Sequence, residues 1–431
     1  MTLAAWPTYD SYKDSGVEWI GAVPHNWRLK RLKHMTRQIS DKVSSKDSSL
    51  RYIGMENVES WSGHLVDGVS EVEGLASKFD AGDVIFGKLR PYLAKATKLN
   101  FSGICSTEFI VMRAEDEVDP DFLAYLLRSS DFVNFIDSST YGSKMPRANP
   151  SFIANCPVVI PPLPEQRAIA AFLDEKCAKV DEAVRIKEAQ IALLRERRQI
   201  LIQQAVTRGL NPAAPMKDSG IDWIGQIPAH WEVAKLKFLS NKIVDGTHFT
   251  PTYVEEGVPF LRVTDLTNMK DGQVDWENVR RIPEKEHREL SKRANAEYGD
   301  VLLSKNGTIG ITRVVDWKNE FSFFVSLCLI KLRKELIPNY FVSFFGSPLV
   351  DEQLYFGSLR TSVTNLHLEK IKELLIVVPP RSEQEELVAQ ISIISKPIDD
   401  AIRIKEDQIA ALKEYKTSLI NAAVTGKIKV V

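Results

Sequence analysis

A fifteen-residue segment is present twice in this chain, and this duplication limits the folds open to it. KDSGVEWIGAVPHNW at 13–27 and KDSGIDWIGQIPAHW at 217–231 share nine identical positions. A second pair, DEAVRIKEAQIA at 181–192 and DDAIRIKEDQIA at 399–410, shares nine of twelve. Because both pairs have one member in each half, the chain is a tandem duplication. Two units of this size favour a pseudo-dimer within one polypeptide.

Each half consists of a lead-in, a variable segment and a helix. The variable segments contain short β-branched and aromatic runs such as VIFGKL and FIVMRA, separated by turn residues, which are typical of strands. We therefore predict two mostly β domains with a few helices. The predicted boundaries are a lead-in at 1–27, a first β-rich domain at 28–160, a central helix at 161–210, a repeated lead-in at 211–231, a second β-rich domain at 232–378 and a C-terminal helix at 379–431.

The two predicted long helices carry a heptad pattern. Apolar residues recur at alternating steps of three and four over roughly four to five heptads, which indicates a coiled coil. The predicted seam contains Leu173, Val180, Val184, Ile191, Leu194 and Leu201 with Ile398, Ile402, Ile409, Leu412 and Leu419. The cations Lys187, Arg198, Lys405 and Lys416 interrupt it, either fixing register or reaching out to solvent. The alternative is that each helix packs on its own domain.

Composition and motifs argue against an enzyme. The 431 residues suggest about two to four domains. The seven histidines lack metal-ligand spacing, and the chain has no GxGxxG, P-loop or GxSxG motif. GTIG at 307–310 is either a phosphate-binding turn or a plain tight turn. The net charge of −1 argues mildly against a free-standing nucleic-acid binder.

The same sequence favours a cytoplasmic location. No apolar run is long enough for a membrane span, and the first residues lack the features of a secretion signal. The four cysteines are scattered without CxxC spacing, which fits a reducing compartment. We therefore expect no membrane association.

The repeated wording resembles a known family. KDSGxxWIGxxPxxW, then a variable β-rich domain ending in PPLPEQ, then a helix, all repeated, resembles the specificity subunits of type I restriction-modification systems. DGTHFTP at 245–251, GVPFLRVTDL at 257–266 and GDVLLSKNGTIG at 299–310 resemble a target recognition domain of that family. In the first domain SLRYIGMENVES, at 49–60, replaces the Asp-Gly-Thr-His segment. The resemblance covers nearly the whole chain.

The resemblance implies an α+β fold. Two β-rich target recognition domains are separated by two long antiparallel helices that form a coiled coil, with an internal pseudo-two-fold repeat. About 43 helical residues would span roughly 65 Å and separate the two half-sites of a bipartite double-stranded DNA target. The resemblance also implies a non-catalytic DNA-binding subunit for host defence and DNA methylation, with no cofactor of its own. Its expected partners are two methyltransferase (modification) subunits using S-adenosylmethionine, and restriction or motor subunits using ATP with Mg.

Candidate DNA contacts follow from side-chain chemistry. Arginine and lysine suit phosphates and guanine, whereas Asn, Gln, Ser and Thr suit adenine edges and phosphates. The candidates in the first domain are Lys88, Arg90, Tyr92, Ser143, Lys144, Arg147 and Asn149. Those in the second are Thr247, His248, Arg262, Lys305, Asn306, Thr308, Ser358, Arg360, Thr361, Ser362 and Asn365. The alternative for each residue is a solvated surface position.

Two further functions remain open from the sequence. One is a coiled-coil adaptor that bridges two protein-binding β domains. The other is a fused methyltransferase and nuclease, which the missing Asn-Pro-Pro-aromatic and P-loop motifs oppose. The pseudo-two-fold arrangement itself makes a geometric prediction. It brings Lys13 near Lys427, with Trp19 and Trp223 as the apolar anchors of the two lead-ins.

Overall fold

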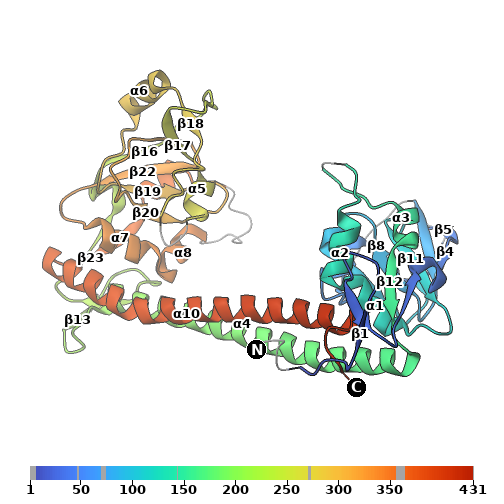
Figure 1. Ribbon diagram of the computed structural model, residues 1–431. Helices are drawn as coiled ribbons and strands as arrows, with labels where there is room; N and C mark the ends of the chain where they lie inside the picture. The colour runs from blue at the N-terminus through green and yellow to red at the C-terminus, as the bar shows by residue number, and fades with distance from the viewer. Residues whose placement is uncertain are drawn as a thin grey trace. The chain divides into compact units, whose positions relative to one another are not determined.

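The chain forms two compact units that do not coincide with the two halves of the sequence (Figure 1). The computed structural model describes residues 6–45, 48–68, 74–142, 144–269, 273–355 and 365–430. Unit 1 combines Met1–Glu188 with Lys405–Val431, and unit 2 is Ala189–Ile404. Each unit therefore contains one lead-in, one β-rich domain and part of both long helices.

The β-rich domain of unit 1 is built on two four-stranded sheets. The order β4-β11-β8-β9 comprises Thr36–Ile39, Phe109–Ala114, Val84–Gly87 and Ala96–Lys98. The order β5-β7-β10-β6 comprises Lys42–Ser44, Leu75–Phe79, Gly103–Ser106 and Tyr52–Ile53, with β6 parallel to β10. The short pair is β12 (Pro157–Ile160) with β3 (Arg28–Arg31). Short helical elements complete the domain: η2 Leu32–His34, η3 Met55–Asn57, η4 Pro91–Leu93, α1 Pro120–Arg128, α2 Ser130–Asp137 and α3 Pro150–Asn155.

Unit 2 repeats this plan. Its main sheet has the order β16-β22-β19-β20, from Ser240–Asp245, Leu327–Leu332, Val301–Ser304 and Thr312–Val314. A second sheet has the order β18-β17-β21, from Arg281–Ile282, Val258–Leu261 and Ser322–Phe323, with β17 parallel to β21. The short pair is β15 (Glu232–Lys235) with β23 (Leu375–Val378). The helical elements are η5 Leu236–Phe238, α5 Val263–Thr267, α6 Glu284–Arg293, α7 Pro338–Phe345, α8 Pro348–Tyr355 and α9 Leu368–Lys372.

The equivalence of the two domains corrects one sequence alignment. Segment 49–60 contains β6, which pairs in parallel with β10, as β17 pairs with β21. The main-chain N–H of Gly54 is bound by Asn57 just as that of Arg262 is bound by Asp265. Segment 49–60 therefore corresponds to the region of β17 and α5, and it does not replace the Asp-Gly-Thr-His segment.

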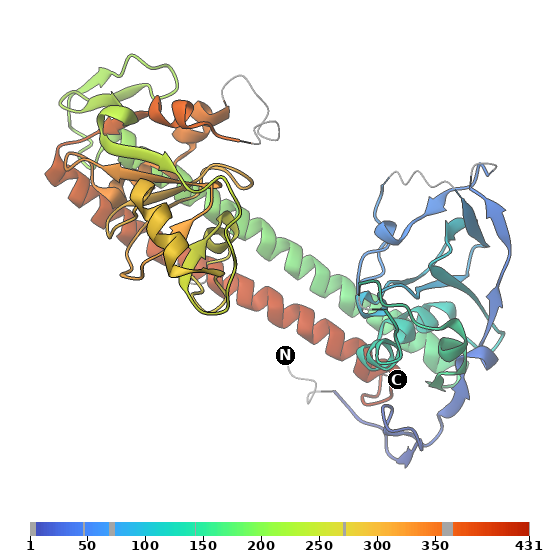
Figure 2. The same cartoon turned by 90° about the horizontal axis from the view of Figure 1, so that it is seen from above.

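The long helices are α4 (Leu163–Arg208) and α10 (Arg381–Val424), which lie side by side within each unit (Figure 1 and Figure 2). In unit 1 they run antiparallel, since Asp181 binds Lys416 while Lys187, further along α4, binds Gln408. All eleven predicted seam residues are buried or half-buried, so the coiled-coil prediction is confirmed. The C-terminal helix is shorter than predicted, because it ends at Val424 where Gly426 adopts a left-handed φ of 73°.

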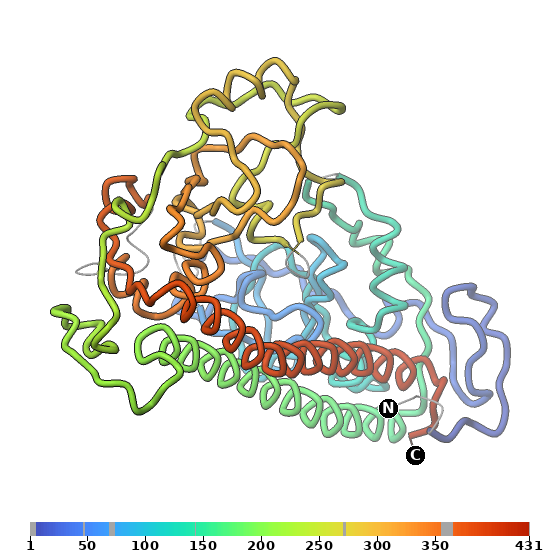
Figure 3. The backbone as a smooth tube through the Cα atoms, turned by 90° about the vertical axis from the view of Figure 1, so that its left-hand side faces the viewer, coloured from blue at the N-terminus to red at the C-terminus, as the bar shows by residue number. Residues whose placement is uncertain are grey.

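Each lead-in forms a β-hairpin that packs on the end of a long helix. The hairpins are β1–β2 (Tyr12–Asp14, Ala22–Pro24) in unit 1 and β13–β14 (Met216–Asp218, Gln226–Pro228) in unit 2. The segment after α10 returns to the first lead-in, where Lys429 N donates to Pro7 O at 2.7 Å (Figure 3). Tyr12, the neighbour of Lys13 in the sequence, and Lys427 line one hollow there.

The predicted anchors Trp19 and Trp223 pack against the cores of their units, but a second tryptophan of each lead-in is buried more deeply. Trp19 and Trp223 are only half-buried, whereas Trp27 and Trp231 are fully buried. The ring of the second tryptophan in each lead-in, Trp27 or Trp231, lies at the C-terminal end of a long helix. A Cβ at Gly426 would lie 3.3 Å from the ring of Trp27, and one at Gly209 would lie 3.1 Å from the ring of Trp231. The same contact therefore seals α10 in unit 1 and α4 in unit 2.

The helix starts are fixed to their domains by the glutamate and glutamine of the PEQ and SEQ motifs. Trp27 Nε1 donates to Glu165 at 3.2 Å, and Trp231 Nε1 donates to Glu383 at 2.8 Å. Gln166 is buried and donates to the carbonyl oxygens of Glu117 and Pro161, while it accepts from Asp119 N. Gln384 makes the same three bonds in unit 2. Within the described ranges no helix is long and apolar enough to cross a membrane.

Candidate nucleic-acid interface

In the first domain two predicted segments lie side by side. Arg90 N donates to Pro146 O at 2.7 Å, and Ala148 N donates to Lys88 O at 2.9 Å. A bridge pairs Leu89 with Arg147. The loop after β8 and the segment before α3 are therefore held together by main-chain bonds, although more than fifty residues separate them in the sequence.

The side chains of these segments form a basic and aromatic surface, which we name the first-domain surface. It contains Lys88, which is half-buried, and the exposed Arg90, Tyr92, Tyr141, Lys144 and Met145. Tyr141 and Met145 are 63% and 54% exposed. Cations bind phosphate oxygens and base edges, and aromatic rings stack on bases. The surface has the chemistry of a nucleic-acid contact.

Sequence reasoning missed Tyr141 and Met145. Both lie within the YGSKMPRANP segment, but apolar residues are usually buried and the sequence carries no sign that these two are exposed. A pair of large apolar side chains beside exposed cations becomes visible only in the fold.

Two predicted contacts of the first domain have partners within the protein. Arg147 donates twice to Glu108, at 3.1 Å each, and this ion pair raises the pKa of Arg147. Asn149 accepts from Ser151 N at 2.8 Å and caps α3. Through these bonds both side chains stabilise the segment that carries the first-domain surface. Ser143 lies outside the described residues.

The second domain arranges the equivalent segments in the same way. Leu366 N donates to Lys305 O at 2.8 Å, and a bridge pairs Asn306 with Asn365. Thr308 and Asn365 are exposed and Asn306 is half-buried. Among the residues that the structure describes, the second-domain surface, Asn306, Thr308 and Asn365, is therefore polar where the first is basic and aromatic. The predicted contacts Ser358, Arg360, Thr361 and Ser362 lie outside the described residues.

Asp245 of the Asp-Gly-Thr-His segment gathers two cations and a histidine inside the second domain. Its carboxylate lies 3.3 Å from Lys305, 2.5 Å from Arg293 and 3.1 Å from His248. Burial alone would raise the pKa of Asp245, but Lys305, His248 and Arg293 outweigh burial and hold that pKa below its usual range. Lys305 is only 5% exposed, and its ammonium is bound by Asp245 inside the domain. This position argues against the predicted DNA contact.

The rest of this segment is also structural. A Cβ on Gly246 would lie 2.1 Å from Phe323 O, so only glycine fits there. Thr247 is buried, and its hydroxyl donates to Phe249 O at 3.3 Å. Arg262 pairs with Asp265 at 3.0 Å, at the start of α5. Of the predicted residues in this group, His248 alone keeps a largely exposed side chain among those that the structure describes.

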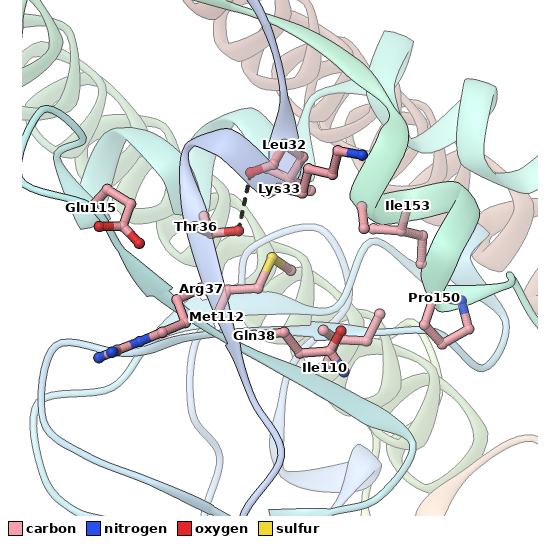
Figure 4. Close-up of a pocket in the computed structure, with 11 residues that line it drawn as sticks. Leu32, Lys33, Thr36, Arg37, Gln38, Ile110, Met112, Glu115, Pro150 and Ile153 are labelled. Atoms are coloured by element: carbon pink, nitrogen blue, oxygen red, sulfur yellow. Dashed lines mark hydrogen bonds between the residues drawn. The ribbon is translucent and has the colours of Figure 1, made fainter.

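A separate hollow of about 370 Å³ lies on the first domain among η2, β4, β11 and α3 (Figure 4). Its apolar lining includes Ile110, Met112 and Ile153, and Lys33, Arg37 and Glu115 also line it. None of the predicted DNA contacts lines this hollow. Among the described residues, no three His, Cys, Asp or Glu side chains form a group suited to a metal ion.

Comparisons with known proteins agree with the resemblance. A family model for the type I restriction modification DNA specificity domain matches residues 52–194 and 228–414. A Methanocaldococcus jannaschii protein assigned as the MjaX type I restriction enzyme specificity subunit is 25% identical over 439 residues, covering 95% of this chain and 96% of that protein. The EcoKI specificity subunit of Escherichia coli K12 is 25% identical over 339 residues, covering 76% and 69% respectively.

A solved structure matches as well. It comes from a study of complex assembly and conformational transition of the type I R-M system, and its chain aligns with a TM-score of 0.66 at 24% identity. The match covers 93% of this chain and 98% of the other, which shows a shared fold. The family model covers more than half of the sequence and matches most of both β-rich domains and part of each long helix. This chain therefore belongs to the family defined by the type I restriction modification DNA specificity domain.

Proposed function

We propose that the chain is the DNA-sequence-reading subunit of a type I restriction-modification complex. In this proposal each β-rich domain reads one half-site of a bipartite double-stranded DNA target, with an unspecified gap between the half-sites. The chain performs no chemistry itself, and the family to which it belongs is one of DNA specificity.

One observation carries the proposal. Two domains whose main sheets have the same strand order present different side chains from the same place, after β8 and after β19. The first offers exposed Arg90, Tyr92 and Lys144, and the second offers Thr308 and Asn365. Two domains that bind different base sequences need different side chains at equivalent positions of the same fold, because base edges are discriminated by side-chain chemistry.

The partners and cofactors of the complex belong to the same proposal. Two methyltransferase subunits would bind this chain and supply S-adenosylmethionine chemistry on adenine. Restriction or motor subunits would join with ATP and Mg, and the assembly would act in the cytoplasm. The chain holds no cofactor of its own. Its near-neutral charge supports shared DNA clamping, since partner subunits would contribute cations to the phosphate backbone.

The test is DNA binding by the full chain, alone and with its methyltransferase subunits, to a random duplex pool at several salt concentrations. We expect affinity to fall steeply with salt while a preference for one bipartite sequence persists. Sequencing the methylated genome of a host carrying both proteins should return the same target. Binding without any sequence preference would leave the coiled-coil adaptor as the better description.

A further inference from the structure

Three strained residues converge on one corner of the first domain. Trp61, Arg90 and Ala94 have φ values of 66°, 51° and 49°, and among the described residues they are the only non-glycine residues with positive φ. Trp61 N donates to Leu93 O at 3.2 Å, which joins the first to the other two. Left-handed backbone is rare for residues other than glycine and gathers at functional sites.

This corner adjoins the first-domain surface. Arg90 and Ala94 flank η4, which carries the exposed Tyr92, and the backbone of Arg90 is bonded to Pro146. Trp61 stands at the turn between Val58 and Leu65, which form a bridge. The strain therefore fixes the place from which Arg90 and Tyr92 project.

A buried arginine supports the corner from beneath. Arg128, at the end of α1, is 8% exposed, and its guanidinium donates to Ser62 O at 2.8 Å and to Ala96 O at 3.2 Å. The central carbon of its guanidinium, Cζ, lies 4.7 Å from the ring centre of Tyr125. A Cβ on Gly63 would lie 1.9 Å from Nη1, so glycine is needed for this approach. One side chain thus ties the Trp61 turn to the strand that follows Ala94.

Burying the charged side chain of Arg128 costs free energy. Burial lowers its pKa, and the hydrogen bonds seen for it among the described residues go to carbonyl oxygens rather than to a carboxylate. The second domain has no arginine at the equivalent position. Pro120, which begins α1, and Ser129, which follows it, correspond to Pro338 and Ser347, so Gly346 stands in the place of Arg128. The buried arginine and its bonds to Ser62 and Ala96 are therefore specific to the first domain, and the shared fold does not require them.

We propose that Arg128 is a positioning residue for sequence reading, and that Trp61, Arg90 and Tyr92 form a preorganised tip that selects the bases of one half-site. This inference rests on the proposed function. A tip held in its binding conformation loses less freedom on contact with DNA, and a guanidinium held in place can bind a guanine edge through two hydrogen bonds. The tip should therefore select a G·C pair.

The first experiment compares full-length Arg128→Met and Arg128→Lys with the parent chain, in complex with the methyltransferase. The probes are a duplex with the selected target, and duplexes with either half-site scrambled. We expect Arg128→Met to bind the target at least about 10-fold more weakly while its affinity for fully scrambled DNA is unchanged. Preference should relax at one half-site, the same one relaxed by Arg90→Ala. Arg128→Lys, which can still donate to one carbonyl, should recover part of the loss.

Arg113→Met is the matched control. Arg113 is an ion-paired arginine of the first domain, bound to Asp80 and Asp83 and remote from η4 in its contacts. It should lower thermal stability while both half-site preferences stay as in the parent. If Arg113→Met and Arg128→Met lose affinity equally at both half-sites, Arg128 is merely structural and the inference is overturned.

A second variant covers the case in which Arg128→Met does not fold. Ala94→Gly removes only one buried methyl group, and glycine adopts the left-handed conformation without strain. We expect it to fold and to lose selectivity at the same half-site, because the loop is no longer held. Full selectivity in Ala94→Gly would overturn the preorganised tip. A parent chain without any sequence preference would instead contradict the proposed function.

Discussion

The ammonium of Lys416 lies 2.7 Å from the carboxylate of Asp181, across the two helices of unit 1. The same pair recurs in unit 2, where Arg198 lies 3.3 Å from Asp399. Asp181 and Asp399 are equivalent positions of the repeat, and so are Arg198 and Lys416. These two seam cations, Lys416 and Arg198, are therefore each neutralised by an aspartate of the other helix, so that each unit has one such ion pair.

Reversing one member should test this pairing. Asp181→Lys places two cations together, and because the pair is partly exposed we expect a loss of about 0.5–1 kcal/mol at low salt. Adding Lys416→Asp should restore the parent's stability. Thermal unfolding at low and high salt measures both effects. Glu182→Lys, which breaks only a surface pair with Arg185, is the control; an equal loss there would mean that the cross-helix pair has no special role.

The apolar seam should carry more stability than its charges. Ile191→Asp together with Ile409→Asp places a carboxylate in the helix interface of each unit, and burying an unpaired charge costs several kcal/mol. We expect a lower unfolding temperature and weaker assembly with the methyltransferase. Leu193→Asp with Ile404→Asp is the control, because these side chains are 64% and 52% exposed on the same helices. Equal behaviour of the two pairs would contradict the seam.

The lead-in should depend on its second tryptophan. Trp27→Ala removes a fully buried ring and the bond to Glu165, and we expect a loss of about 3–5 kcal/mol. Trp19→Ala should cost less, since Trp19 is half-buried and stacks on Phe135. Denaturant unfolding of both variants measures the difference. A larger loss for Trp19→Ala would restore the anchor expected from the sequence.

The cation cluster of the second domain should make stability pH-dependent. The folded-state pKa of Asp245 is depressed, so its contribution is present above the unfolded pKa, about 4, and is lost as pH falls through the folded pKa. Asp245→Asn should flatten unfolding stability across that acidic range. Lys305→Ala should unfold more easily by about 1–3 kcal/mol. If Lys305→Ala keeps the parent's stability and loses DNA affinity, Lys305 is a DNA contact after all. Arg360→Ala stays a prediction of weaker DNA binding.

The circular arrangement predicts the behaviour of half of the chain. Residues 1–210 lack the part of α10 that completes unit 1, but they contain Arg198, the equivalent of Lys416. We expect them to form a homodimer in which Asp181 of one copy pairs with Arg198 of the other. With methyltransferase present, the dimer should modify a palindrome of the first half-site. Sedimentation tests the mass, and a folded monomer at high concentration would contradict the arrangement.

The sequence by itself determined the architecture of this protein. Motifs repeated in the same order in both halves specify a duplicated unit, and a heptad pattern specifies two helices that pack along one seam, because these signals are local and periodic. The exchange of helix ends between halves was also predictable, since the second lead-in follows the first helix directly and symmetry requires the same neighbour for the first lead-in.

The tertiary structure decided the roles of individual side chains. Lys305 and Lys88 occupy equivalent places, yet Lys305 is buried because Asp245 faces it, whereas Lys88 is half-buried at a basic surface. Trp27 rather than Trp19 anchors the lead-in because the helix end, with its glycine, comes to that ring. Such roles depend on which distant group lies within a few ångströms. Burial, charge pairing and backbone strain arise from contacts between segments far apart in the sequence, which no local pattern encodes.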